Sequence, residues 1–212
     1  MHRVPNPDAA FARTNVQSLE QRVALVGELC PGARSIGEIC AGDCTAQARL
    51  YRERLGLERY VAVDVSPAIA ARLAAAGIEH ICGDALDERV MRPLAALDVL
   101  FFGPPLSHDC DGHRLLAFDD VRPAYGAFVE LVLGRLAFAG TLVCIAPRST
   151  NLGDARRLHA IARAAAPDVG LRRIHYSWST VTGHGEATEP RLKYVELWLA
   201  RGGDEWRTSG AP

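Results

Sequence analysis

Residues 35–64 read SIGEICAGDCTAQARLYRERLGLERYVAVD, and the rest of the chain continues the pattern that this stretch begins. The stretch starts with a short apolar run, and a tight turn around Gly42 follows it. The segment ARLYRERLGLE predicts a helix, and YVAVD predicts a second buried strand that stops at Asp64. A strand, a glycine turn, a helix and a strand that ends on an acid are typical of a βαβ unit that binds a nucleotide.

The chain after this unit repeats the alternation of helix and strand. Ser66 and Pro67 match the N-cap and the first residue of a helix, and Gly77 matches the residue that ends it. Residues 79–83 then predict a short strand, with Asp84 just past its end. The later pattern predicts strands over 98–102 and 141–146 and helices over 123–136 and 151–166.

The pattern changes near the C-terminus. Residues 169–182 and 192–201 alternate apolar and polar side chains and are separated by GHGEATEP, which predicts two antiparallel strands. The expected fold class is therefore α/β, a Rossmann-like three-layer sandwich. Its sheet has seven strands, is mostly parallel and ends in an antiparallel β-hairpin.

The two ends of the chain lie outside this alternation. Residues 1–14 predict a flexible N-terminal arm. Apolar residues at helical spacing over 16–29 predict a helix that covers the sheet. Residues 202–212 predict a polar tail with little reason to order. The expectation is one domain over residues 15–201.

Composition limits the classes of partner. The 212 residues carry 24 basic and 25 acidic side chains, so the net charge of −1 does not favour a polyanionic partner such as nucleic acid. No apolar span approaches the length of a membrane helix, and no basic stretch is followed by an apolar run, so we expect neither a membrane helix nor a signal peptide. Six cysteines without a CxxC pair predict reduced, mostly buried thiols in a cytoplasmic protein: Cys30, Cys40, Cys44, Cys82, Cys110 and Cys144.

Five helix-linked strands, a terminal antiparallel pair and acids after the first three strands resemble the class I S-adenosylmethionine-dependent methyltransferases. The resemblance covers residues 35–201. The first motif of that family is an acid followed by alternating glycines. Here Glu38 matches the acid and Gly42 the central glycine, whereas Cys40 and Cys44 replace the flanking glycines.

The resemblance implies S-adenosylmethionine as the methyl donor and S-adenosylhomocysteine as the product. Asp64 matches the acid that accepts both ribose hydroxyls, and Asp84 matches the acid that receives the adenine amine, with Ala85 near the ring. The expected donor site is Glu38, Cys40, Gly42, Asp64, Val65, Asp84, Ala85 and Gly103. A nicotinamide-dinucleotide enzyme is the alternative within this fold, but its GxGxxG fingerprint is absent from the turn.

The sequence FFGPPL at 101–106 lies where amino-methylating members of the family carry an Asp/Asn-Pro-Pro-aromatic tetrad. The chain keeps both prolines, Pro104 and Pro105, and has Gly103 for the acid and Leu106 for the aromatic residue. The rigid turn and its carbonyls can still aim a nucleophile. We assign Pro104 to the transfer site and Pro105 to the acceptor. A turn that only ends a strand is the alternative.

The next residues, SHDCDGHR at 107–114, are rich in groups that carry chemistry. We expect His108 to remove a proton from the acceptor, oriented by Asp109, and His113 to contact the acceptor. A metal site is an alternative, although adjacent ligands do not converge easily on one ion, so no metal is assigned. A solvated loop without a chemical role is the third interpretation.

Two further residues are candidates for contact with the acceptor. His184 lies in the turn of the terminal hairpin, which in this fold can cover the active site, and an exposed turn is its alternative. Tyr125 is an aromatic residue that can line an acceptor pocket, and core packing is its alternative.

The sequence therefore predicts a cytoplasmic S-adenosylmethionine-dependent methyltransferase that methylates a nitrogen, or an oxygen, of a small-molecule acceptor. One alternative is an amino-methyltransferase of RNA or another nucleic acid, with a basic face supplied by the arginines at 156, 157, 163, 172 and 173. Another is a non-catalytic subunit that binds the donor. The oligomeric state does not follow from the sequence.

Overall fold

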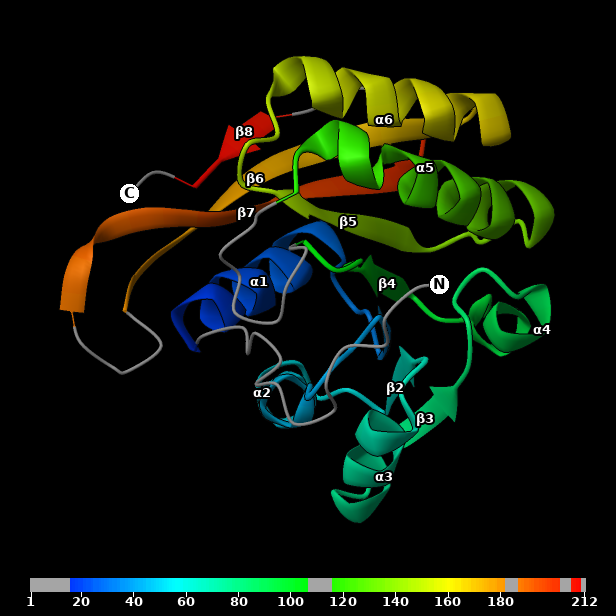
Figure 1. Cartoon of the computed structure of the whole chain (residues 1–212), viewed down its shortest axis with the longest axis vertical. Helices are drawn as coiled ribbons and strands as arrows, with labels where there is room; N and C mark the ends of the chain where they lie inside the picture. Colours follow the sequence, from blue (N-terminus) through cyan, green and yellow to red (C-terminus); the bar gives the residue numbers. More distant parts are fainter. Residues whose placement is uncertain (1–15, 107–115, 182–186, 203–206, 211–212) are drawn as a thin grey trace.

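A computed structural model describes residues 16–106, 116–181, 187–202 and 207–210. Helices and strands alternate along most of the chain (Figure 1). The elements are α1 Val16–Leu29, β1 Ser35–Ile39, α2 Thr45–Leu55, β2 Arg59–Asp64, α3 Pro67–Ala75, β3 Glu79–Cys82, α4 Glu88–Met91, η1 Arg92–Leu94, β4 Val99–Phe102, α5 Phe118–Val129, η2 Glu130–Arg135, β5 Thr141–Pro147, α6 Leu152–Ala165, β6 Val169–Val181, β7 Ala187–Arg201 and β8 Arg207–Ser209. The N-terminal arm lies outside the described residues.

The sheet has the order β3-β2-β1-β4-β5-β7-β6-β8. Strands β3, β2, β1, β4 and β5 are parallel, and β7 is antiparallel to both β5 and β6. The order reverses at β1, where β2 lies on one side and β4 on the other. In an open α/β sheet a ligand binds outside the carboxyl ends of the strands at this reversal.

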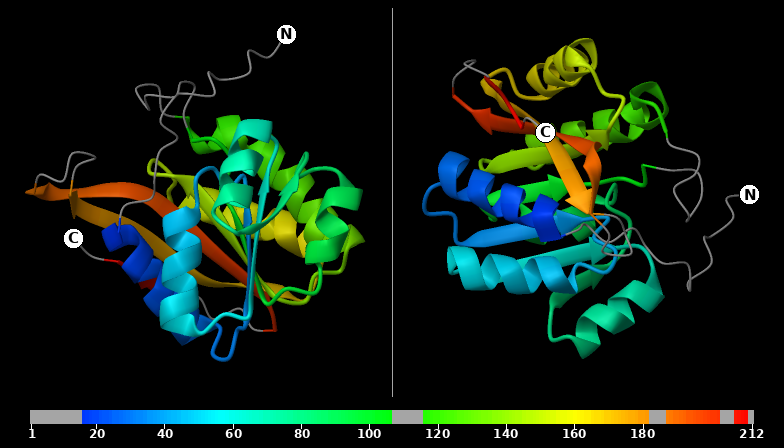
Figure 2. Two further views of the ribbon diagram at one scale, coloured as in Figure 1. Left: turned by 90° about the horizontal axis from the view of Figure 1, so that it is seen from below. Right: turned by 90° about the vertical axis from the view of Figure 1, so that its left-hand side faces the viewer.

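Two apolar layers cover the sheet, which confirms the three-layer α/β architecture (Figure 2). Side chains of α1, α2 and α3 pack on one face, and side chains of α4, η1, α5, η2 and α6 pack on the other. Strand β4 is buried along its whole length because it lies between these layers and between two neighbouring strands.

Local signals place the helix ends where the sequence predicts them. The Ser66 side chain accepts a hydrogen bond from the Ile69 amide at the start of α3, and Gly77 follows that helix at a φ of 66°. Asn151 and Asp154 form a reciprocal capping box at the start of α6. These contacts lie within four residues in sequence, so the helix ends follow from local chemistry.

The strand count and the polar tail differ from the sequence-based expectation. The sheet has eight strands, because residues 207–209 of the predicted tail form β8 alongside β6. The indole of Trp178 donates to the Gly210 carbonyl at 3.1 Å, and His175 Nδ1 lies 3.1 Å from Ser209 Oγ. Side chains of β6 therefore hold this short segment, which its own sequence does not predict.

Two element boundaries also differ. The helix predicted over 123–136 begins at Phe118, because the Asp120 carboxylate accepts the Ala117 amide and caps the earlier turn. Strand β7 begins at Ala187 instead of residue 192 and makes a longer hairpin with β6. Figure 2 shows this hairpin extending beyond the other strands.

None of the helices in the described residues is long and apolar enough to cross a membrane.

Gly140→Ala is expected to lower the free energy of unfolding by about 2–3 kcal/mol through overpacking. A Cβ at this position would lie 2.3 Å from the Asp98 carbonyl oxygen and 2.6 Å from the Phe138 ring. Gly126→Ala is the matched control, since its Cβ meets nothing within 4 Å inside α5. It should stabilise the protein by about 0.5–1 kcal/mol. Urea unfolding measures both, and a Gly140→Ala variant as stable as wild type would contradict the packing described here.

Candidate functional site

Apart from Glu38, the residues that the sequence predicts for the donor site gather at the carboxyl edge of the sheet, where β1, β2, β3 and β4 end. The backbone of each loop bonds to the neighbouring strand at this edge. The Ala41 amide donates to the Val63 carbonyl at 3.0 Å, and the Gly103 amide donates to the Ile39 carbonyl at 3.2 Å. Parallel strands of similar length bring their carboxyl ends together, so loops distant in sequence become neighbours.

Asp64 links the first loop to the second. One of its carboxylate oxygens accepts the Gly42 amide at 2.9 Å, and the other accepts the Ser66 amide at 2.9 Å. A carboxylate offers about four acceptor positions. The half-buried Asp64 can therefore hold the glycine turn and still accept two hydroxyl groups from a ligand.

The first loop contains two residues in the left-handed region. Cys40 has a φ of 58° and Gly42 a φ of 54°. Glycine adopts this conformation without strain, but a residue with a Cβ does not. Burial, together with the nearby Asp64 and Asp84 carboxylates, raises the pKa of the Cys40 thiol to about 12, so it is protonated at neutral pH.

Cys40→Val is expected to lower the free energy of unfolding by about 2 kcal/mol, because a β-branched side chain is strained at this φ. Cys40→Gly should change it by less than about 1 kcal/mol, since relief of strain offsets the greater freedom of the unfolded chain. Cys82→Val, at an exposed strand position, is the control and should have little effect. Equal denaturation midpoints for the two Cys40 variants would show that the backbone here is unstrained.

Asp84 lies past the end of β3, on the other side of Asp64 from the first loop. It is exposed, and its carboxylate accepts the Leu86 amide at 2.9 Å. The side chains of Val65 and Leu86 are 71% and 45% exposed. Such exposure is unusual for large apolar residues in this chain: among the described residues only Leu152 is a further example. The edge beside Asp64 and Asp84 thus has an uncovered apolar surface.

The turn after β4 completes this edge. Gly103 is close to β5, since a Cβ there would lie 3.2 Å from the Ile145 side chain. Pro104 is buried and Pro105 is exposed, so the two prolines face different surroundings. Tyr125 is fully buried, and its hydroxyl donates to the Ile145 carbonyl at 2.5 Å. Tyr125 therefore packs in the core and has no surface to offer an acceptor.

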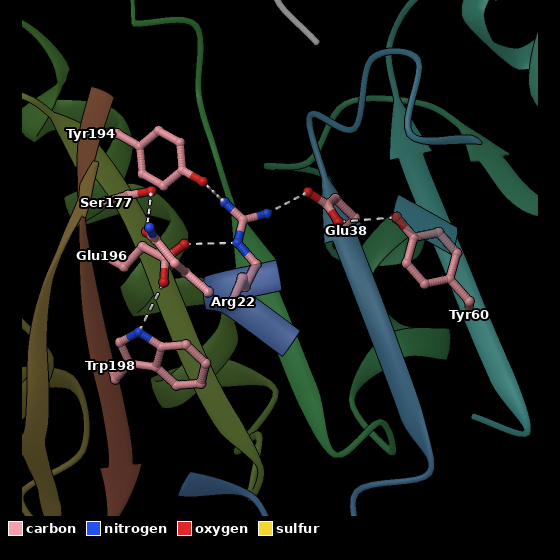
Figure 3. Close-up of polar contacts among 8 residues, drawn as sticks. Arg22, Glu38, Tyr60, Ser177, Tyr194, Glu196 and Trp198 are labelled. Atoms are coloured by element: carbon pink, nitrogen blue, oxygen red, sulfur yellow. Dashed lines mark hydrogen bonds and ion pairs between the residues drawn. The ribbon is translucent and has the colours of Figure 1, made fainter. Parts of the chain in front are cut away.

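The Glu38 side chain lies between Arg22 of α1 and Tyr60 of β2 (Figure 3). Glu38 is 7% exposed. Arg22 donates to one carboxylate oxygen at 3.3 Å, and the Tyr60 hydroxyl donates to the other at 3.0 Å. Burial raises the pKa of Glu38, and the Arg22 charge and the Tyr60 hydroxyl partly oppose that rise. Both oxygens are thus engaged within the protein.

Solved structures share this arrangement. The chain is similar to a proposed RNA methyltransferase from Pyrococcus horikoshii, with a TM-score of 0.60 and 12% identity over 95% of this chain and 92% of that one. The plantazolicin methyltransferase BamL, solved with S-adenosylhomocysteine, has a TM-score of 0.58 and 11% identity over 89% and 85%. The methyltransferase domain of bacterial CtHen1-C has a TM-score of 0.58 and 13% identity over 88% and 98%.

The chain shares the fold of these methyltransferases. No family profile matches the sequence, and no curated protein matches it significantly. At such low identity the neighbours establish the fold only, which confirms the α/β architecture expected from the sequence.

Four predicted site residues, His108, Asp109, His113 and His184, lie outside the residues that the structure describes. Their roles stay predictions. Most of the described residues that the sequence predicts for the donor site do reach a common edge: Cys40, Gly42, Asp64, Val65, Asp84, Ala85 and Gly103. Glu38 lies on β1, which leads into this edge, but its side chain is buried and does not contribute to the surface of the edge.

The partners of Glu38 in this fold do not follow from the sequence. Arg22 occupies the apolar stripe of α1, between Leu19 and Val26, and Glu196 interrupts the apolar run of β7. A charged residue in an apolar stripe is a signal that can be found in sequence, because charges are seldom buried without a partner. The sequence does not show, however, that Arg22 and Glu196 are partners of each other.

Proposed function

We propose that the protein is an S-adenosylmethionine-dependent methyltransferase with its donor site at the carboxyl edge of β1 to β4. The observation that carries this proposal is the Asp64 carboxylate. It bonds the Gly42 amide at 2.9 Å and keeps acceptor positions for a ribose. The class I methyltransferase fold supports the assignment, because its donor occupies this edge.

The residues present fit a nucleoside. Asp64 would accept the ribose hydroxyls, and the exposed Asp84 carboxylate would accept an adenine amine. An adenine ring between Val65 and Leu86 would cover their exposed apolar surface. The left-handed Gly42 presents a backbone without a side chain to the rest of the ligand. Each part of the ligand thus has a protein group of matching chemistry.

The donor supplies a methyl group on a positively charged sulfur, so the protein contributes alignment and exclusion of water. Carbonyls of the Gly103–Pro105 turn would accept hydrogen bonds from the acceptor, with Pro104 keeping the turn rigid. Cys40 is a potential competing nucleophile beside the donor. Its pKa of about 12 keeps the thiol protonated and therefore protects it from methylation.

We further propose a small-molecule acceptor methylated on nitrogen or oxygen, with His108 and Asp109 managing its proton. Two of the five arginines that could form a basic face for nucleic acid are paired with acids. Arg157 is paired with Asp119, and Arg173 is paired with Glu28, so these cations are neutralised locally. A non-catalytic donor-binding subunit would show donor binding without turnover.

Calorimetric titration of S-adenosylhomocysteine into the wild-type protein tests the donor site, with NAD⁺ as the control ligand. We expect micromolar binding of the first and none of the second. Binding of NAD⁺ alone would replace the proposal with a dinucleotide enzyme. Binding of neither would refute both. A radiolabelled-methyl assay with a panel of small amines and phenols, and with total RNA, then separates the acceptor classes.

A further inference from the structure

A buried polar cluster lies between α1 and the sheet, in a mainly apolar layer (Figure 3). We define it as Arg22, Glu38, Tyr60, Tyr194, Glu196 and Trp198. Arg22 is 1% exposed, and its guanidinium contacts Glu196 at 2.7 Å, Glu38 at 3.3 Å and the Tyr194 hydroxyl at 3.2 Å. The Trp198 indole donates to the second Glu196 oxygen at 3.2 Å. One cation therefore serves two buried carboxylates.

The cluster connects strands that are not neighbours. Glu38 lies on β1 and Glu196 on β7, and β4 and β5 separate these strands in the sheet. The guanidinium carbon crosses this gap 4.9 Å from the centre of the Phe101 ring on β4. Arg22 is long and planar enough to bind a carboxylate on each side while it contacts the ring between them. A lysine at this position has no such fork.

Both ends of the bridge are close to the proposed site. Glu38 is two residues before Cys40, the strained start of the first loop. Tyr194 is paired with Pro147, the last residue of β5, at the same carboxyl edge. The bridge thus connects the strand that holds the donor loop with the strand at the acceptor side of the edge.

A purely structural role explains this cluster poorly. Taking two carboxylates and a guanidinium out of water is costly, and apolar side chains of similar volume usually stabilise a core at least as well. The left-handed loop after Glu38, in contrast, needs an anchored strand end, since its own backbone does not favour that conformation. A group that fixes Glu38 from both α1 and β7 supplies this anchor.

We propose that Arg22 is a positioning residue for methyl transfer: it fixes the donor loop, through Glu38, against the acceptor side of the sheet, through Glu196 and Tyr194. This inference rests on the proposed function, which supplies the identity of the donor and the place of its site. It does not require Arg22 to touch donor or acceptor, because the guanidinium is buried.

The test compares Arg22→Met with the triple variant Arg22→Met, Glu38→Gln, Glu196→Gln. The triple variant leaves no unpaired buried charge, so it should recover most of the thermal stability that the single variant loses. We expect its affinity for S-adenosylhomocysteine to remain at least tenfold below wild type. Recovery of affinity together with stability would overturn the proposal. Leu199→Ala, a buried residue of β7 toward the amino edge, is the control that loses stability but keeps affinity.

Hydrogen exchange of the ligand-free proteins gives a readout independent of the donor. The Ala41 amide donates to the Val63 carbonyl of β2, and the Gly42 amide donates to the Asp64 carboxylate. We expect both amides to exchange with solvent at least tenfold faster in the triple variant than in wild type. Unchanged exchange would overturn the proposal. Failure of the wild type to bind S-adenosylhomocysteine would instead refute the proposed function, and the exchange comparison would still decide whether Arg22 fixes the loop.

Discussion

Asp64→Ala is expected to weaken the binding of S-adenosylmethionine by at least about a hundredfold. Hydrogen bonds to a charged group contribute about 1.5–3 kcal/mol each, and the variant loses the two that the ribose would make. It also releases the Gly42 amide, which the carboxylate holds at 2.9 Å. Calorimetric titration at a temperature well below the unfolding transition measures the loss in folded protein.

Asp87→Ala is the matched control for this variant. Asp87 lies in the loop after β3, and like Asp64 its carboxylate accepts a backbone amide, that of Arg89, at 2.9 Å. It differs in that it caps the N-terminus of α4 and does not contact Gly42. Its removal should leave donor affinity within about twofold of wild type and lower stability by about 1 kcal/mol. An Asp64→Ala variant that binds as tightly as this control would place the donor elsewhere.

Arg22→Met is expected to lower the free energy of unfolding by about 3–5 kcal/mol, because it leaves buried carboxylates without their cation. Glu38 and Glu196 are 7% and 1% exposed, so water does not replace the guanidinium. For a chain of 212 residues this corresponds to a fall in Tm of about 10 °C. Thermal unfolding followed by circular dichroism measures it.

The loss of stability caused by Arg22→Met should depend on pH in a defined direction. Burial raises the pKa of Glu38, and Arg22 opposes that rise, so removing Arg22 raises the pKa further. A carboxyl whose folded pKa is raised favours folding when protonated and loses this contribution as pH rises through that pKa. The difference in stability between wild type and Arg22→Met should therefore narrow as pH falls from about 8 to about 5.

Arg59→Met is the exposed counterpart. Arg59 and Glu79 form an ion pair at 2.6 Å, and both side chains are more than one-third exposed. Water and salt screen such a pair, so its loss should cost less than about 1 kcal/mol. Similar losses for Arg22→Met and Arg59→Met would mean that the buried cluster contributes no more than a surface pair.

Much of the fold and part of the site could be predicted from sequence, because the deciding signals are local. The strands around Asp64 are apolar runs of strand length, and Ser66 and Gly77 mark the ends of α3 through contacts within a few residues. The order of acids after successive strands also follows from the chain alone. Parallel pairing then brings those strand ends to one edge.

The remaining features depend on which elements become neighbours. Strand β8 exists because Trp178 and His175 of β6 hold a polar segment about 30 residues further along. Tyr125 is a core residue because its hydroxyl meets the carbonyl of Ile145 on β5. A periodicity argument identifies an apolar face but not the side chains that it meets.

The α/β alternation, the glycine turn and the carboxylates at the strand ends could be predicted from the sequence, since periodicity, capping and turn chemistry act over a few residues. The contacts of Glu38 with α1 and the bridge from Arg22 to Glu196 depend on tertiary packing, because the sheet order places β1 and β7 under one helix. Arg22 and Glu196 are 174 residues apart, and no local pattern pairs charges at that separation.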